Sequence, residues 1–197
     1  MEKIRKKLIQ IWDNEIRDAL GRGEVVLEQQ LKAEMYHQLR LKFPKYKIWT
    51  TPTLYLKKYD LDRIKPDLVI SNDKEILAII QLKFKPWEFL DYKEDLRILT
   101  GLDKVGKSKK IKLGMIPFSS VWQEQKTKEE NNLNFTITDD LLKVLITGSR
   151  AGCHSLELKK EEKPSQNFLH LFGYIENETS LFFGNSFYGK EKEKEVE

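Results

Sequence analysis

Polar side chains border the most apolar stretch of the sequence, which runs from Ile76 to Phe84. Gln81 and Lys83 lie near its end, and Asp67 lies before it at the start of a shorter apolar run. A carboxylate, an amide oxygen and an ammonium group placed together are suited to binding a metal ion and stabilising charge on a phosphate. Whether the three side chains form such a site depends on the elements that carry them.

The residues between Asp67 and Lys83 predict two strands joined by a tight turn. Asn72–Glu75 supplies the turn residues. Side chains two residues apart on a strand point to the same face, so Gln81 and Lys83 are expected to share one. Antiparallel pairing would place Asp67 opposite Ile80 or Gln81. The sequence therefore predicts that Asp67, Gln81 and Lys83 converge at one end of a hairpin.

A further acidic group comes from the second predicted helix, which spans about residues 24–41. Glu28 lies one helical turn before Leu31 and interrupts a stripe that faces the core. A half-buried carboxylate needs a partner, and a divalent ion bound by Asp67 and Glu28 would supply one. Glu34 lies on a partly inward face of the same helix and is the alternative to Glu28.

This arrangement resembles the PD-(D/E)xK nuclease superfamily, which has the restriction-endonuclease-like fold. The resemblance rests on Pro66-Asp67, on Gln81-Leu82-Lys83 at the end of an apolar strand and on Glu28 in an upstream helix. It extends over residues 24–118 and implies metal-dependent hydrolysis of phosphodiester bonds, most simply in DNA, with Mg²⁺ or Mn²⁺ as the cofactor. It also implies that Asp67 and Glu28 bind the ion and that Lys83 is the catalytic lysine, which positions or activates water.

The chain departs from the family pattern at Gln81, where the family has an acidic residue. An amide offers a neutral oxygen where a carboxylate offers a charged one. Gln81 is therefore expected to assist catalysis and metal binding, with the backbone carbonyl of Leu82 as a further ligand. The same departure supports a second hypothesis, a catalytically inactive member of this fold that binds nucleic acid or a protein. A third, an unrelated α/β domain, predicts that Asp67 and Lys83 lie far apart.

The densest basic stretch lies in a predicted polar loop over residues 101–112. Its lysines are expected to contact nucleic-acid phosphates, although a solvated loop explains them equally well: Lys104, Lys107, Lys109 and Lys110. The formal net charge of +4 permits a nucleic-acid partner without requiring one.

The remaining elements predict a mixed α/β domain with a central sheet, flanking helices and a C-terminal β-hairpin. Helices are expected over residues 3–20, 88–103 and 139–146; strands over 47–56, 67–71, 76–84 and 111–118; and the hairpin over 168–175 and 180–187. The helix over 88–103, which follows the motif, and the strand over 111–118 also fit the order of the restriction-endonuclease-like fold. One domain is expected over residues 1–189, followed by a disordered charged tail, 190–197.

The composition indicates the size of the domain and the expected cellular location. The chain has 197 residues, of which 40% are hydrophobic, which suits one domain with a sizeable core. Cys153 is the single cysteine, so an intrachain disulfide is excluded and a reducing, cytoplasmic location is expected. No stretch approaches the roughly 20 apolar residues of a membrane span, so no membrane partner is expected. The sequence leaves both a monomer and a homodimer open.

Overall fold

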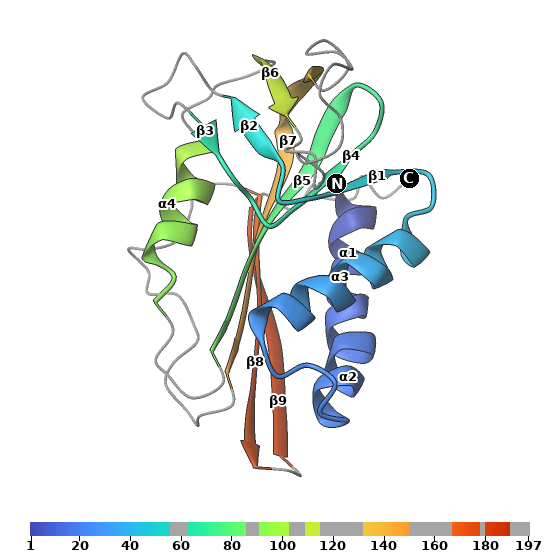
Figure 1. The fold of residues 1–197 in the computed structure, drawn as a ribbon, viewed down its shortest axis with the longest axis vertical. Helices are drawn as coiled ribbons and strands as arrows, with labels where there is room; N and C mark the ends of the chain where they lie inside the picture. The colour runs from blue at the N-terminus through green and yellow to red at the C-terminus, as the bar shows by residue number, and fades with distance from the viewer. Residues whose placement is uncertain are drawn as a thin grey trace, which may run out of the picture.

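The computed structural model describes residues 1–55, 63–85, 91–102, 109–114, 132–149, 167–177 and 180–189. Within these residues the chain forms a mixed α/β fold in which helices lie on both faces of one large mixed sheet (Figure 1). The helices are α1 (Glu2–Ile11), α2 (Arg17–Gly21), α3 (Glu28–Lys42) and α4 (Lys93–Gly101), and a π-helical segment, Trp12–Ile16, joins α1 to α2. The strands are β1 (Lys47–Thr50), β2 (Thr53–Tyr55), β3 (Arg63–Ile64), β4 (Leu68–Ser71), β5 (Glu75–Lys85), β6 (Lys109–Gly114), β7 (Asn132–Ser149), β8 (Phe168–Asn177) and β9 (Ser180–Tyr188).

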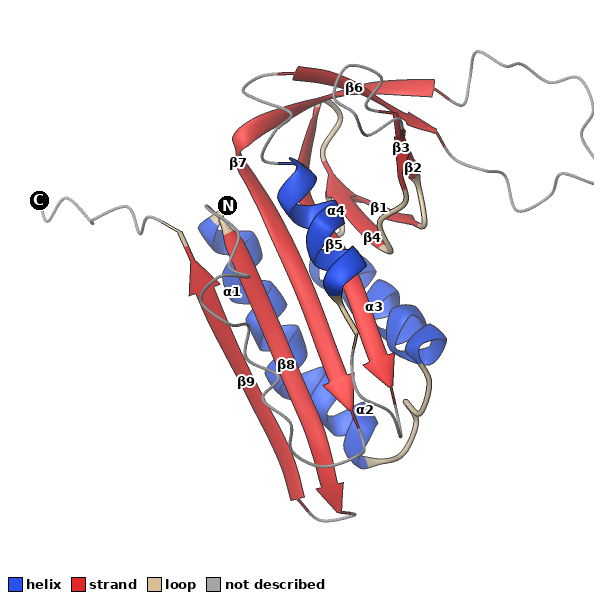
Figure 2. Cartoon of the chain, turned by 90° about the vertical axis from the view of Figure 1, so that its left-hand side faces the viewer, coloured by secondary structure: helices blue, strands red, loops and turns tan. Residues whose placement is uncertain are grey.

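The sheet is organised around the long strand β7. Its main path has the order β1-β4-β5-β7-β6-β2-β3, and β8 and β9 extend the sheet from the second half of β7. The pairs β5–β7 and β7–β8 are parallel, and the other pairs are antiparallel. Figure 2 shows β5, β7, β8 and β9 running side by side, with α4 on one face and α1 to α3 on the other.

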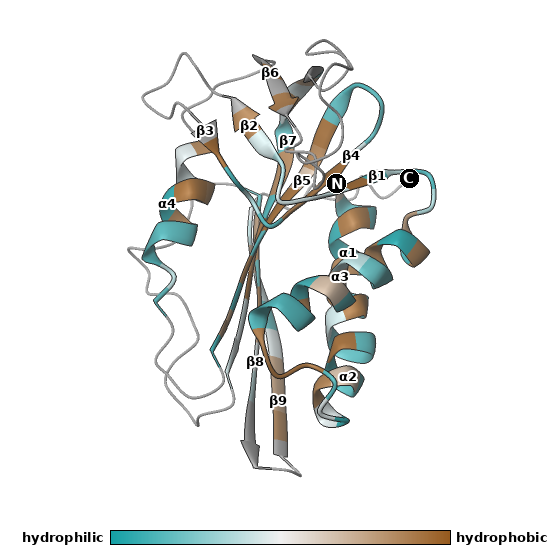
Figure 3. Ribbon diagram, viewed as in Figure 1, coloured by the Kyte–Doolittle hydropathy of each residue, from teal (hydrophilic) through white to brown (hydrophobic). Residues whose placement is uncertain are grey.

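Each face of the sheet has its own hydrophobic core. Along β5, Ile80, Leu82 and Phe84 pack against the helices α1 to α3, whereas Ile79 packs on the side of α4. Strands buried on both faces read as nearly continuous apolar runs, which is the pattern of β5. In Figure 3, β4 is brown along most of its length, whereas α3 carries both brown and teal segments.

The predicted hairpin is confirmed. β4 and β5 pair antiparallel with Leu68 opposite Ile80, so Asp67 lies opposite Gln81, one of the two predicted positions. The C-terminal hairpin is also confirmed by the antiparallel pairing of β8 with β9. The first predicted helix corresponds to the continuous helical stretch Glu2–Gly21.

The predicted helix over residues 139–146 is wrong, because this segment belongs to β7. Leu141 to Ile146 are all buried and alternate between the two cores, with Lys143 among them. A short apolar run of this kind has neither a helical nor a strand period, so its partners decide its conformation. Thr138 and Asp139, which suggest a helix cap, lie within the strand instead.

Two other boundaries differ from the predictions. The strand expected over residues 47–56 is divided into β1 and β2 at Thr51, whose backbone has a φ of 46°, and the two parts pair with different strands. The strand expected over residues 111–118 is β6, which pairs with β2 and β7. The strand that pairs with β5 on the side away from β4 is β7. The predicted charged tail, 190–197, lies outside the described residues.

None of the described helices combines the length and the apolar character needed to cross a membrane.

Candidate functional site at the open edge of β5

The site forms where β5 extends beyond its neighbour. β4 begins at Leu68, opposite Ile80, whereas β5 continues to Lys85. Among the described strands, β7 pairs with one side of this extension and none pairs with the other. Buried backbone N–H groups on an unpaired edge need acceptors. The residues that supply these acceptors are those predicted to form the site.

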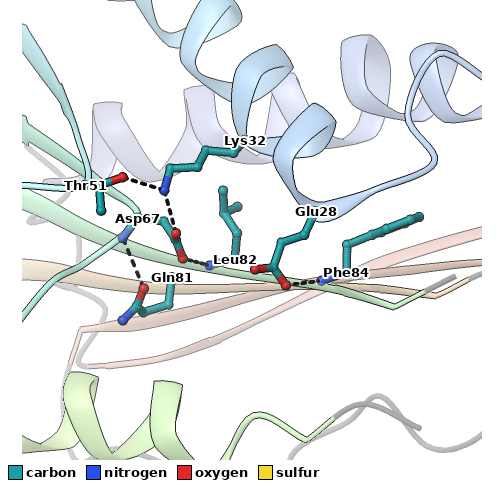
Figure 4. Close-up of polar contacts among 7 residues, drawn as sticks. All are labelled: Glu28, Lys32, Thr51, Asp67, Gln81, Leu82 and Phe84. Carbon is teal, nitrogen blue, oxygen red and sulfur yellow. Dashed lines mark hydrogen bonds and ion pairs between the residues drawn. The ribbon is translucent and has the colours of Figure 1, made fainter. Parts of the chain in front are cut away.

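Two carboxylates bind the open edge. Asp67 Oδ2 accepts a hydrogen bond of 2.9 Å from the N–H of Leu82, and Glu28 Oε2 accepts one of 3.1 Å from the N–H of Phe84 (Figure 4). Glu28 begins α3, which crosses above the edge, and Asp67 immediately precedes β4. Alternate residues of a strand direct their N–H groups to the same edge, so the two carboxylates lie along one line. Helix α3 and the residue that precedes β4 thereby meet at the open edge of β5.

Gln81 fixes the backbone of Asp67. Its side chain is only 2% exposed, and its Oε1 accepts a hydrogen bond of 3.1 Å from the N–H of Asp67. Figure 4 shows the Gln81 side chain on the opposite side of β5 from Glu28, toward α4. The amide oxygen is therefore engaged by the chain itself, next to the carboxylate that it was expected to assist.

The donor set is compatible with a hydrated divalent ion. In a strand the N–H and C=O of one residue point to the same edge, so the carbonyl of Leu82 faces the edge at which Asp67 and Glu28 lie. Mg²⁺ binds through one or two carboxylates and keeps several waters. Among the described residues no three Asp, Glu, His or Cys side chains gather closely enough to hold a metal ion. Two carboxylates and one carbonyl would therefore leave the remaining positions to water or to a phosphate.

Lys83 lies on the α4 side and faces a carboxylate that sequence reasoning missed. Its Nζ is 4.0 Å from Asp95 Oδ2, and the two side chains are 26% and 15% exposed. Burial raises the pKa of Asp95 to about 6; Lys83 opposes this shift, and Asp67 and Glu28 add to it. Asp95 lies one turn before Leu99 on the core side of α4, and this inward spacing is the signal that was available in the sequence.

Lys32 is the second residue that sequence reasoning missed. It follows Glu28 by one helical turn, and its Nζ lies 2.8 Å from Asp67 Oδ1. Residues four apart on a helix share a face, so the position of Glu28 was itself the signal for Lys32. We refer to the six residues as the β5-edge cluster: Glu28, Lys32, Asp67, Gln81, Lys83 and Asp95.

The structure also bears on Glu34, the alternative to Glu28, and on the predicted basic loop. Glu34 accepts a hydrogen bond from Gln38 on its own helix, so the structure brings Glu28 and not Glu34 to β5. Lys109 and Lys110 are the first residues of β6, not part of a loop, so that part of the loop prediction is wrong. Their side chains, and all of Lys104 and Lys107, lie outside the described residues, so the predicted phosphate contacts stay a prediction.

A separate set of buried polar groups lies on β7 and β8, on the face of the sheet that carries Lys83. His170 Nε2 is 2.9 Å from Thr147 Oγ1, and burial lowers the pKa of His170 to about 4. Burial also lowers the pKa of Lys143 to about 8. An imidazole with this pKa is uncharged at neutral pH, so His170 contributes no positive charge to the face that carries Lys83.

Replacing Asp95 with asparagine is expected to stabilise the protein at neutral pH. The pKa of Asp95 is raised from 3.8 to about 6, so between these values the folded state holds a proton that the unfolded state has lost. Stability therefore falls as the pH rises through this window, and the full cost is present above pH 6. After discounting for partial exposure, Asp95→Asn should gain about 1–2 kcal/mol at pH 7 and much less at pH 4. Urea unfolding at both pH values measures the difference.

Glu94 provides the matched control on the same turn of α4. Its side chain is exposed, and a hydrogen bond from Arg97 lowers its pKa, so Glu94→Gln should not stabilise the protein at pH 7. A gain from Asp95→Asn that is equal at pH 4 and pH 7 would show that ionisation of Asp95 carries no cost in the fold.

The β5-edge cluster combines oxygen donors for a cation with ammonium groups for an anion. Glu28 and Asp67 face the open edge, Lys32 reaches Asp67 from α3, and Lys83 lies on the α4 side. Such a pairing suits a ligand that is itself a metal-bound anion, of which a phosphate ester is the common biological case. Comparison of the chain with protein-family models, with curated proteins and with solved structures gave no match.

Proposed function

We propose that this chain is a metal-dependent nuclease of the PD-(D/E)xK superfamily, with a restriction-endonuclease-like fold, that hydrolyses phosphodiester bonds in DNA. The observation that carries the proposal is the convergence of Asp67 and Glu28 on the open edge of β5, where they bind the N–H groups of the two residues that flank Lys83. Two separate elements, helix α3 and the β4–β5 hairpin, supply these groups. A purely structural role would not require an ammonium group at the same strand end.

The order of the elements also supports the proposal. The resemblance expects a helix with an inward glutamate, a hairpin that carries the motif, a following helix and a further strand. Here α3 precedes the β4–β5 hairpin, α4 follows it, and β7 then pairs in parallel with β5. The strand expected over residues 111–118, β6, also follows α4 and pairs with β7.

The proposed roles follow from the contacts. Asp67 and Glu28 would hold Mg²⁺ or Mn²⁺ together with the carbonyl of Leu82. The ion, when bound, polarises the phosphate and makes a bound water more acidic. Lys83 would stabilise the negative charge that develops on the phosphate oxygens. Gln81 would hold the backbone of Asp67 in place through its hydrogen bond to the Asp67 N–H.

A second candidate function is a catalytically inactive module of the same fold that binds nucleic acid or a protein. It is favoured by the contacts that Asp67 already makes within the chain. Its Oδ1 is paired with Lys32 and its Oδ2 with the N–H of Leu82, so both oxygens have partners without an ion. Such a module would bind nucleic acid or a partner protein and would not cleave DNA with any divalent ion.

A cleavage assay tests the proposal. Purified protein is incubated with plasmid, linear duplex and single-stranded DNA, and with RNA, in Mg²⁺, in Mn²⁺ and with a chelator. We expect DNA cleavage in at least one of the two ions and none with the chelator. Cleavage that persists in the chelator would exclude the proposed site as its source. Binding without cleavage in both ions would favour the inactive module.

A further inference from the structure

Lys32 is held in the β5-edge cluster by two hydrogen bonds. Its Nζ lies 2.8 Å from Asp67 Oδ1 and 2.7 Å from Thr51 Oγ1 (Figure 4). The side chains of Lys32 and Asp67 are each 22% exposed, so the pair is mostly withdrawn from water. Fixing a long lysine side chain costs about 1.5–2 kcal/mol of conformational entropy. A lysine placed here is therefore a specific feature of the site and not a solvated surface charge.

The backbone of Thr51 is unusual, and it supports the contact between Lys32 and Asp67. Its φ of 46° lies in the left-handed region, which is unfavourable for a β-branched residue. In this conformation the N–H of Thr51 donates to the carbonyl of Asp67 at 2.8 Å, while its hydroxyl accepts from Lys32. Strained residues of this kind persist where the surroundings fix them, and they cluster at functional sites. Thr51 thus links the end of β1 to both members of the ion pair.

Lys32 occupies the oxygen of Asp67 that a metal ion would need. Asp67 Oδ2 is bound to the N–H of Leu82, which leaves Oδ1, and Lys32 is bound there. With three carboxylates and two ammonium groups, the cluster carries a formal charge of −1 when Asp95 is ionised. A divalent ion would change this to +1 and would compete directly with Lys32 for Oδ1. An anion beside the ion would then restore the balance of charge.

We propose that Lys32 is a phosphate-binding residue, which neutralises Asp67 in the free protein and transfers its contact to a substrate phosphate when a divalent ion binds Asp67. This inference rests on the proposed function and extends it. The ammonium group needs to move only from one oxygen anion to another at the same site. Lys83, whose Nζ lies 4.0 Å from Asp95 Oδ2, takes no part in this exchange.

The substitution Lys32→Met tests the exchange because it keeps the apolar stem and removes the charge. Without nucleic acid, the affinity for Mn²⁺, measured from the electron paramagnetic resonance signal of free Mn²⁺, should rise about three- to ten-fold, since a competing cation is gone. Binding of a short DNA duplex, measured by fluorescence anisotropy with Ca²⁺ in place of Mg²⁺, should weaken. The slope of log affinity against log salt should fall by about one.

Two further variants serve as controls. Lys45→Met removes a charge from an exposed lysine outside the cluster and should leave Mn²⁺ affinity unchanged. Lys32→Arg keeps the charge and should preserve duplex binding and the salt slope. Lys32→Gln replaces Lys32→Met in both measurements if the methionine variant does not fold.

The outcomes separate this inference from the proposed function. If the wild-type protein cleaves DNA but Lys32→Met changes neither Mn²⁺ affinity nor duplex binding, the exchange is wrong and the nuclease stands. Mn²⁺ affinity that falls in Lys32→Met would also overturn it, because Lys32 would then support the metal site. If wild type and variant bind neither Mn²⁺ nor the duplex, both proposals fail.

Discussion

Replacing Lys83 with methionine is expected to lower the rate of DNA cleavage by about 10²–10⁴-fold with little change in duplex affinity. An ammonium group that acts on charge developing in the transition state contributes to the rate more than to binding. Methionine keeps the length and the apolar stem of lysine, so the packing of β5 is conserved. Single-turnover cleavage with saturating protein measures the rate, and anisotropy in Ca²⁺ measures the affinity.

The substitution also has a consequence that does not depend on cleavage. Lys83 is the cation that lowers the pKa of Asp95, so without it the pKa of Asp95 should rise further above 6. Lys74→Met is the matched control, since Lys74 is exposed in the turn at the other end of β5. Full cleavage activity in Lys83→Met would remove Lys83 from the mechanism. Equal losses in the two lysine variants would indicate a general effect of charge.

Replacing Gln81 with glutamate is expected to raise the affinity for Mn²⁺ by about ten-fold or more and to increase cleavage. An added charged oxygen strengthens binding of a hard divalent ion. The glutamate would retain the hydrogen bond from the N–H of Asp67, because a carboxylate accepts it more strongly than an amide. Isothermal titration with Mn²⁺ and the cleavage assay measure the two effects.

The same substitution should destabilise the protein when no ion is present. Position 81 is 2% exposed, and a buried carboxylate beside Asp67 is costly without a cation, by about 1–3 kcal/mol. Addition of Mn²⁺ should therefore raise the melting temperature of Gln81→Glu more than that of the wild type. Gln10→Glu, on the exposed side of α1, is the control. An unchanged Mn²⁺ affinity would mean that residue 81 does not face the ion.

Cleavage that appears only in Gln81→Glu would favour the inactive-module hypothesis for the natural chain. The site would then have the geometry for an ion but too little negative charge to hold it. Cleavage by both proteins would instead show that the amide is sufficient.

The hairpin at the centre of the site was predictable because its geometry is local. Strand residues alternate with a period of two, and the turn at residues 72–75 brings Asp67 opposite Ile80 or Gln81; an irregularity in the pairing between Ile70 and Ser71 then selects Gln81. The inward position of Glu28 followed from helical spacing in the same way. In both cases short-range periodicity identifies the strand end or the helix face that carries the group.

The strand over residues 139–146, which was predicted as a helix, shows that local periodicity is not always sufficient. Residues 139–146 begin with two aspartates and continue as a short apolar run, and helix and strand both satisfy that pattern. The segment is a strand because β5 and β8 offer backbone partners on its two sides. Asp95 and Lys32 were missed for a related reason. In sequence each shows only an inward spacing on its helix, and the packing of that helix against β5 is what gives it a partner.

The sequence by itself determined which chemical groups are present and which of them share a strand or a helix face: Asp67, Gln81 and Lys83 on one hairpin, and Glu28 with Lys32 on one helix. Only the tertiary structure decided that these two elements meet, and where. β4 begins at Leu68 and leaves the N–H groups of Leu82 and Phe84 without strand partners, and the two carboxylates satisfy them. The physical reason is that unpaired backbone groups select their partners in space and not along the chain.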